Sequence, residues 1–348
     1  FAPKFDRSRQ DEAWAGQGEV QAADDDRLRE FISREWFAIR PQKIGETGTL
    51  ITPEWQDEAK RVFESRLLQH ESLLKTDSDQ RWMRKVIRAG TQADKVSSLV
   101  MLTQSCPIFS VNWIRALLSM ASKKGRKESM VAIDALRELF AHNLLPDRKL
   151  LFIHQHVVPL DCKTKLDKEL CMTAFWFEDF LKTAYASFIQ IVVNGTHDDT
   201  PHFKKHMLHI VQELLIKKPE QERVLLSCLI NKFGDQDKKS SSGITKLLKA
   251  ILQSHPSMAK IMIGEIGTFL NRQNLNRRAQ TTALTFLSEL KLRRKIDAEV
   301  AKQMTSLLLS QLESVTVQKP EPEKKKLFGG LFGGNKEEKK EDKPRGFR

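Results

Sequence analysis

The chain has 348 residues, a length that suits two ordinary domains or one long array of repeats. It contains only 16 Gly and 12 Pro, whereas sheet-rich proteins with many tight turns usually need more, so composition favours an all-helical fold. Lys and Arg exceed Asp and Glu by 13, and this excess favours an anionic partner, of which nucleic acid is the simplest.

Composition and periodicity divide the chain into four expected parts. These are a flexible N-terminal segment over 1–23, an N-terminal helical region over 24–90, a HEAT-like helical repeat domain over 91–316 and a disordered charged tail over 317–348. The tail carries runs of charge and a doubled Leu-Phe-Gly-Gly sequence, with too little apolar material to fold. In the N-terminal region we expect a short helix near 26–37. A second helix begins at Thr52-Pro53-Glu54 and ends near Lys75, because Thr can cap a helix and Pro fits its first turn.

From residue 94 onward, apolar residues recur at spacings of three and four, which predicts a succession of helices. The expected helices cover 94–104, 108–122, 126–143, 164–193, 201–217, 220–233, 241–254, 257–270, 276–291 and 297–314. The most apolar stretch, 175–193, is interrupted by charged residues, so it is typical of a buried helix rather than a membrane span. We therefore expect no membrane partner.

The later helices come in pairs with related patterns. The apolar residues Leu247, Leu248 and Ile251 have apolar counterparts 36 residues later, at Ala283, Leu284 and Leu287. This offset lies just under the repeat length of HEAT and armadillo proteins. A single helix pair cannot cover its own apolar face, whereas stacked pairs can. The predicted fold is all-α, a HEAT/armadillo-like α-solenoid of stacked helix pairs with disordered N- and C-terminal tails. An irregular helical bundle is the alternative.

The four cysteines form no C-x-x-C pair and no dense framework, which is typical of a reducing compartment in which cysteines serve as small core residues. They are Cys106, Cys162, Cys171 and Cys228.

Sequence signatures of enzymes are absent. The chain has no P-loop, no nucleophile elbow and no H-E-x-x-H pattern, and no strand leads into a glycine fingerprint. We therefore expect no catalysis, no cofactor and no small-molecule substrate.

One cluster has the chemistry of a zinc site. His202, His206 and His209 would share a helix face, and His197, Asp198 and Asp199 stand just before them. The apolar face of this helix lies to one side of the histidines, so a solvated flank is favoured and no metal is expected. A metal-dependent hydrolase built on residues 197–209 remains a minor alternative.

Groups of basic residues are more informative, because they stand in turns and at helix ends, which collect on the edges of a solenoid. Aligned groups would bind phosphates with little base preference and with strong salt dependence. Motifs for sequence-specific recognition of bases are absent. The candidate RNA-binding residues are Lys123, Lys124, Arg126, Lys127, Arg148, Lys149, Arg277, Arg278, Arg293, Arg294 and Lys295. Solvated surface charge is the alternative reading of these groups.

An ordered set of segments carries a family resemblance. The segments are 90–95, 123–127, 132–140, 144–150, 218–222, 231–235, 255–258 and 278–287, among them the sequences Lys-Lys-Gly-Arg-Lys, Leu-Leu-Pro-Asp-Arg-Lys-Leu and Asn-Lys-Phe-Gly-Asp. In the order of its segments and in their amino-acid sequences, the set resembles the nucleolar complex, or CCAAT-binding-factor, family of ribosome-biogenesis factors over roughly residues 30–315.

The resemblance implies a non-catalytic helical repeat scaffold of the nucleolus and nucleus. It implies action early in maturation of the large ribosomal subunit, in pre-60S particles, with pre-ribosomal RNA, a second nucleolar complex protein and other assembly factors as partners. The alternative function is a HEAT-repeat adaptor or transport factor that binds other proteins without direct RNA binding. The salt dependence of binding distinguishes the two functions, because affinity for RNA should fall steeply as the salt concentration rises, whereas affinity of an apolar groove for a peptide should change much less.

Overall fold

The computed structural model describes residues 36–38, 48–50, 52–73, 78–123, 125–159, 164–235, 238–292 and 297–317. The described residues are mostly helical. The α-helices are α2 (Pro53–Leu73), α3 (Ser78–Ala89), α4 (Gln92–Ser105), α5 (Val111–Ala121), α6 (Arg126–Leu139), α7 (Lys165–Gly195), α8 (Pro201–Lys217), α9 (Glu222–Asn231), α10 (Lys238–Ser254), α11 (Ala259–Leu270), α12 (Arg277–Ser288) and α13 (Ala298–Val317).

Short elements lie between these helices. The 3₁₀ helices are η1 (Trp36–Ala38), η2 (Pro107–Phe109), η4 (Ile153–Gln155), η5 (Lys232–Gly234) and η6 (Pro256–Met258), and a π-helical turn, η3 (Phe140–Leu144), follows α6. Strand β1 (Gly48–Leu50) pairs antiparallel with β2 (Val157–Pro159), with Thr49 opposite Val158.

The all-helical prediction is confirmed apart from this small strand pair. Each helix expected from residue 94 onward has a counterpart among α4 to α13, and the expected buried helix 164–193 is α7. Two details differ: the helix expected over 126–143 ends its α-helical part at Leu139, and α3 was not foreseen as a separate helix. Of the expected helix near 26–37 only the end, η1, belongs to the described residues, as does only Val317 of the expected tail; the segment 1–23 lies outside them.

Local sequence explains where several helices start. Capping boxes begin α4 and α7, with Thr91 paired to Asp94 and Thr164 paired to Asp167. Pro201 occupies the first turn of α8, where its missing N–H costs no helical hydrogen bond. These three boundaries lie within two residues of the expected ones, because caps and prolines act locally.

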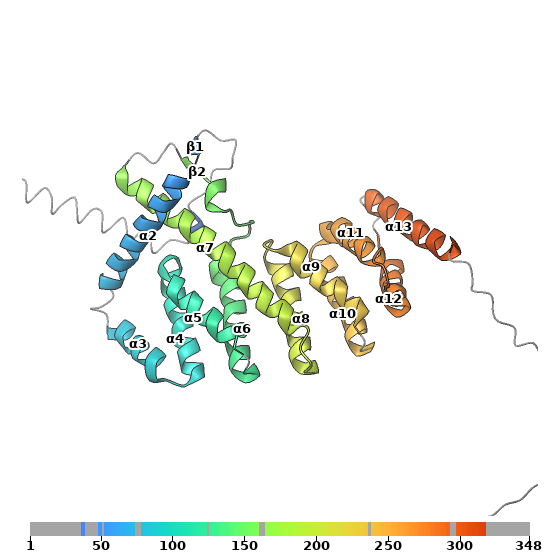
Figure 1. The fold of residues 1–348 in the computed structure, drawn as a ribbon, viewed down its shortest axis with the longest axis horizontal. Helices are drawn as coiled ribbons and strands as arrows, with labels where there is room; N and C mark the ends of the chain where they lie inside the picture. The colour runs from blue at the N-terminus through green and yellow to red at the C-terminus, as the bar shows by residue number, and fades with distance from the viewer. Residues whose placement is uncertain are drawn as a thin grey trace, which may run out of the picture.

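From α8 to α13 the helices follow one another along the long axis of the molecule in chain order (Figure 1). In the second half, α8 packs against α9 and α10, α9 packs against α11, and α11 packs against α13. At the other end, α2 lies against the long helix α7. The result is an elongated row rather than a ball.

Buried positions recur along this row. Leu225, Leu226 and Leu229 of α9 are buried, and 37 residues later Met262, Ile263 and Ile266 of α11 are buried. For α10 and α12 the observed offset is 35: Ile244, Leu248 and Ile251 correspond to Ala279, Ala283 and Phe286. The expected offset of 36 is therefore wrong by one residue for this pair, because Leu247 and Leu284 are only half-buried.

The main hydrophobic core is one cluster that reaches from Trp36 and Phe63 to Phe286 and Leu287. The Trp36 indole nitrogen donates a hydrogen bond to the Leu144 carbonyl at 3.0 Å, so residues of the expected N-terminal region share a core with α6 and α7. The boundaries of the four expected parts stay predictions.

Three of the cysteines take part in the packing as expected. Cys106, Cys171 and Cys228 are buried, and burial raises the pKa of the Cys106 thiol to about 11. Cys162 lies outside the described residues.

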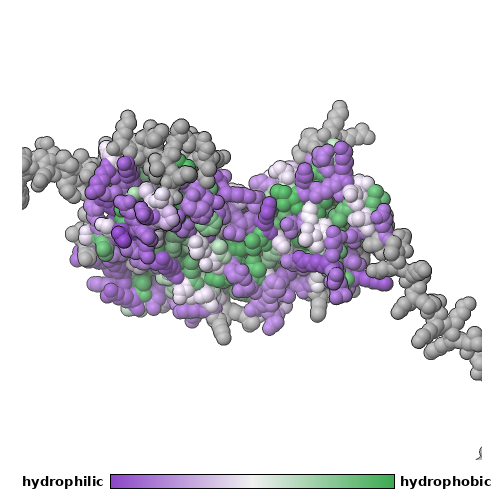
Figure 2. All heavy atoms as spheres, turned by 45° about the horizontal axis from the view of Figure 1, so that its top comes forward, coloured by the Kyte–Doolittle hydropathy of each residue, from purple (hydrophilic) through white to green (hydrophobic). Residues whose placement is uncertain are grey.

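Within the described residues, no helix is both long enough and apolar enough to span a lipid bilayer. Figure 2 shows a mainly hydrophilic surface on the face in view, with hydrophobic residues gathered in patches near the middle and toward the right-hand end.

Alternating helix directions send successive turns to two opposite edges. We name the first the Lys123 edge, formed by the turns α5–α6, α7–α8, α9–α10 and α11–α12. Lys232 Nζ donates to the Thr196 carbonyl at 2.8 Å, and Lys204 Nζ lies 3.3 Å from Asp235 Oδ2, which ties neighbouring turns on this edge together.

The second is the Arg148 edge, formed by residues 145–152, the turns α8–α9 and α10–α11, and the end of α12. The Glu220 carboxylate accepts a hydrogen bond from the Leu150 amide at 2.7 Å. Between the ends of α10 and α12, Lys249 Nζ lies 2.7 Å from Glu289 Oε2.

Candidate nucleic-acid interface

The structure places the candidate RNA-binding residues on both edges. Lys123 and Lys127 are exposed at the α5–α6 turn, and Arg277 is exposed at the start of α12, on the same edge. Arg278, at the second position of α12, is half-buried, and its amide donates to the Asn276 side chain at 3.1 Å. These four residues therefore share the Lys123 edge. Lys124, the side chain of Arg126, and residues 293–295 lie outside the described part of the chain.

Arg148 and Lys149 lie on the opposite edge, where both are ion-paired. The Arg148 guanidinium donates to both carboxylate oxygens of Glu178, at 2.5 and 2.9 Å, and Lys149 Nζ pairs with Glu222. The Glu178 side chain is only 3% exposed, so its negative charge would be buried without compensation if Arg148 were removed. The candidate residues therefore do not form one continuous stripe.

Carboxylates on α7 and in the α8–α9 turn hold the whole 148–156 segment. Glu178 also accepts from the Leu151 amide at 2.8 Å, and Asp179 accepts from the Ile153 amide at 3.0 Å. Lys182 Nζ donates to the Leu150 carbonyl at 2.7 Å and lies 3.2 Å from the Glu220 carboxylate. Because three of these four contacts involve backbone atoms of residues 150–153, the charged side chains position a loop.

His156 ends this segment inside the protein. Its ring is fully buried and stacks on Phe175 with 4.1 Å between the ring centroids. Burial lowers the pKa of His156 to about 4, although the nearby Glu178 carboxylate acts in the opposite direction. The imidazole is therefore neutral at physiological pH and fills the core as an aromatic ring.

The α7–α8 turn separates the basic groups of the Lys123 edge. It carries His197, Asp198 and Asp199, and Asp198 Oδ1 accepts a hydrogen bond from the Thr200 amide at 2.7 Å. Positive charge on this edge is consequently interrupted by carboxylates.

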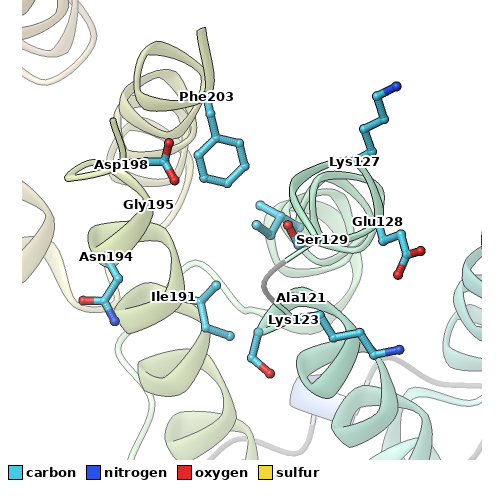
Figure 3. Close-up of a pocket in the computed structure, with 13 residues that line it drawn as sticks. Ala121, Lys123, Lys127, Glu128, Ser129, Ile191, Asn194, Gly195, Asp198 and Phe203 are labelled. Carbon is cyan, nitrogen blue, oxygen red and sulfur yellow. The ribbon is translucent and has the colours of Figure 1, made fainter. Parts of the chain in front are cut away.

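An open groove of about 800 Å³ lies between the α5–α6 and α7–α8 turns. Figure 3 shows that Ile191, Phe203 and Ser129 face this space, whereas Lys123 and Lys127 extend away from it. The groove thus offers an apolar floor with cations at its margin.

The histidine cluster of α8 is not arranged as a metal centre. His206 Nε2 lies 2.8 Å from Asp134 Oδ1 of α6, and His197 Nδ1 lies 3.0 Å from the Val193 carbonyl. His202 and His209 are exposed. Among the described side chains, no group of three or more His, Cys, Asp or Glu residues is placed to hold a metal ion.

Sequence reasoning missed a basic face on α3. Arg81, Lys85 and Arg88 are exposed on this helix, and Trp82 beside them is 62% exposed. Their i, i+4 and i+7 spacing was the available signal, since such residues share one side of a helix. This spacing is harder to recognise in a sequence than a run of adjacent Lys and Arg residues.

Comparison with known proteins gives related sequences, although no family model matches the chain. CCAAT/enhancer-binding protein zeta of Mus musculus is 29% identical over 327 residues, which cover 88% of this chain and 31% of the mouse protein. Nucleolar complex protein 1 of Drosophila melanogaster is 29% identical over 275 residues, covering 75% of this chain and 23% of the fly protein. Ribosome biogenesis protein NOC1 of Chaetomium thermophilum is 29% identical over 278 residues, covering 74% of this chain and 26% of the fungal protein.

The chain thus spans about a third or less of the length of these relatives. The names of the fly and fungal relatives describe nucleolar complex and ribosome-biogenesis proteins rather than enzymes, and they agree with the nucleolar localisation that the resemblance implies. Over most of its length the chain is therefore similar in sequence to proteins named nucleolar complex protein 1 and CCAAT/enhancer-binding protein zeta, as its sequence segments indicated.

Proposed function

We propose that the chain is a non-catalytic scaffold segment of an early large-subunit, or pre-60S, ribosome-biogenesis factor. It holds pre-ribosomal RNA and a second nucleolar complex protein along a HEAT-like α-solenoid. The observation that carries this proposal is homology over most of the chain to proteins named for the nucleolar complex and for ribosome biogenesis.

The recurrence of buried positions supports the solenoid. The patterns of α9 and α11 repeat after 37 residues, and those of α10 and α12 after 35, as expected of stacked helix pairs that cover each other's apolar faces. An elongated stack offers a long surface for an irregular RNA and for protein partners at the same time.

Unbalanced positive charge supports RNA binding. The net charge is +13, and among the described residues no carboxylate pairs with Lys123, Lys127 or Arg277. Such cations bind phosphates with little dependence on base sequence. We assign Arg148 and Lys149 mainly to holding their loop, since carboxylates already engage both.

Ultraviolet cross-linking in cells tests the proposal. Cross-links of the tagged chain to pre-ribosomal RNA are expected, and K123E/K127E should reduce their yield several-fold because it reverses two phosphate contacts. The matched control K246E/K260E carries the same charge change on α10 and α11 and should reduce the yield less. Absence of ribosomal RNA among the cross-links would refute the proposal.

The groove beside Phe203 favours a second candidate, a protein-binding adaptor without direct RNA contact. Its apolar floor, which includes Ile133 and Ile191, fits apolar side chains of a peptide better than phosphates. Titration at rising salt separates the two functions: RNA affinity should fall steeply, and occupancy of an apolar groove should hold.

A further inference from the structure

We propose that the exposed face of α3, formed by Arg81, Trp82, Lys85 and Arg88, binds single-stranded RNA. This inference rests on the RNA binding in the proposed function, and it assigns that binding to residues that stand apart from the candidate clusters at turns.

The geometry of α3 divides its residues between two sides. Gln80 is buried and Met83 and Ile87 are half-buried, and this side packs against α4. A solvent-exposed side carries Arg81, Lys85 and Arg88, which are about one helical turn apart and span about 10 Å along the helix. The three cations therefore form a short straight row that faces solvent.

The charge of this row is not balanced. Three arginines of the described structure meet carboxylates: Arg66 lies 2.5 Å from Glu169, Arg137 lies 2.7 Å from Glu213, and Arg148 pairs with Glu178. Around α3, by contrast, no described carboxylate lies within ion-pair distance of the row, and the sequence of the helix contains a single acidic residue, Asp79. A row of unbalanced cations complements a polyanion.

Trp82 decides which polyanion fits. Its indole is 62% exposed and lies on the helix surface next to the row. A base of an unpaired strand can stack on such a ring while its phosphates meet the neighbouring cations, whereas a duplex keeps its bases inside and an acidic peptide has no flat base to stack. Single-stranded RNA therefore uses all four side chains.

The helix is held firmly enough to present this face. Gly90 directly follows α3, its amide donates to the Val86 carbonyl at 2.7 Å, and the α4 capping box begins at the next residue. A Cβ at Gly90 would lie 2.6 Å from that same carbonyl oxygen, so the tight turn between α3 and α4 requires glycine.

The experiment measures binding of the full chain to a fluorescent 12-nucleotide oligouridylate by anisotropy. R81Q/K85Q/R88Q should weaken binding about tenfold or more. It should also reduce the slope of log Kd against log salt concentration by about 2, since each lost phosphate contact removes about 0.7 from that slope. W82A should weaken binding about fivefold or more with little change in that slope, because stacking is not ionic. Gln retains high helix propensity, and circular dichroism checks that the helical content is unchanged.

The matched control is R223Q/K246Q/K260Q, which removes three exposed cations from α9, α10 and α11. It should weaken binding less than the α3 triple variant. Equal losses in the two triple variants would overturn the proposal, as would undiminished binding by W82A, which would indicate a general polyanion surface or an acidic protein partner. Equal affinity for a duplex of the same length would also overturn it.

The design separates this inference from the proposed function. If the wild-type chain binds no RNA, the RNA-binding part of the proposed function fails together with the inference. If the wild-type chain binds and the α3 variants bind equally well, only the inference fails.

Discussion

Glu178 is the carboxylate on which the Arg148 edge depends most. It accepts hydrogen bonds from both terminal nitrogens of Arg148 and from the Leu151 amide, while its own side chain is almost fully buried. E178A removes these acceptors together and leaves Arg148 without its partner. We expect the free energy of unfolding, measured with urea, to fall by about 3 kcal/mol or more.

The control for this substitution is E138A. The Glu138 side chain is 61% exposed beside Arg137, so its removal should change the free energy of unfolding by less than about 1 kcal/mol. Equal effects of the two substitutions would show that the Glu178 cluster contributes little.

His156 makes stability depend on pH in mildly acidic solution. Its pKa is about 4 in the folded protein and 6.5 as an ordinary histidine, so the unfolded chain takes up a proton first as the pH falls. Stability should be unaffected above about pH 6.5, decline as the pH falls toward 4, and lose about 2 kcal/mol between pH 7 and pH 5 from this residue alone.

H156F tests this expectation, because Phe can keep the stack on Phe175 but cannot titrate. The fall in unfolding free energy between pH 7 and pH 5 should be about 2 kcal/mol smaller in H156F than in the wild-type chain. An unaltered pH dependence in H156F would contradict the assignment.

At the residue scale, the sequence could identify cations but not their partners. Arg148 and Lys149 stand out as a basic pair after Pro146, yet Glu178 and Glu222 lie 30 and 73 positions further along the chain. Only the fold brings them together. The α3 cations are harder to notice in the sequence, because they are separated by other residues there and are aligned only on the helix.

At the element scale, helices were predictable wherever local signals agreed. The helix α7 combines a Thr164 capping box with a long apolar pattern, and its expected start differs from the observed one by a single residue. The strands β1 and β2 were not predictable, because each has three residues and their pairing joins positions more than 100 residues apart. Such pairing depends on the tertiary fold rather than on periodicity.

Two glycines in helices should respond to alanine in opposite ways. A Cβ at Gly195, the last residue of α7, would lie 2.8 Å from Met207 Cγ and 3.1 Å from Phe203 Cε1, in a packed region. A Cβ at Gly243, inside α10, would meet no atom within 4 Å. By thermal or urea unfolding, G195A should lose about 1–3 kcal/mol, and G243A should gain about 0.5–1 kcal/mol from helix propensity. A stabilising G195A would contradict the close packing between α7 and α8.

On the scale of the whole molecule, the ends of the row should be less stable than its middle. α13 packs against α11, yet its Leu309 and Leu312 side chains are 55% and 62% exposed, whereas α7 buries most of its apolar residues. Hydrogen exchange followed by mass spectrometry should show amides of α13 exchanging faster than those of α7. Equal protection in both helices would indicate that the described chain unfolds as one unit.

The alternation of turns between the two edges also determines how probes can be attached to the protein. A short epitope or a dye inserted in the α11–α12 turn would emerge on the Lys123 edge, while one inserted between α10 and α11 would emerge on the Arg148 edge. Two such labelled chains would therefore report on opposite flanks of any larger particle that incorporates the protein, with the helices between them undisturbed.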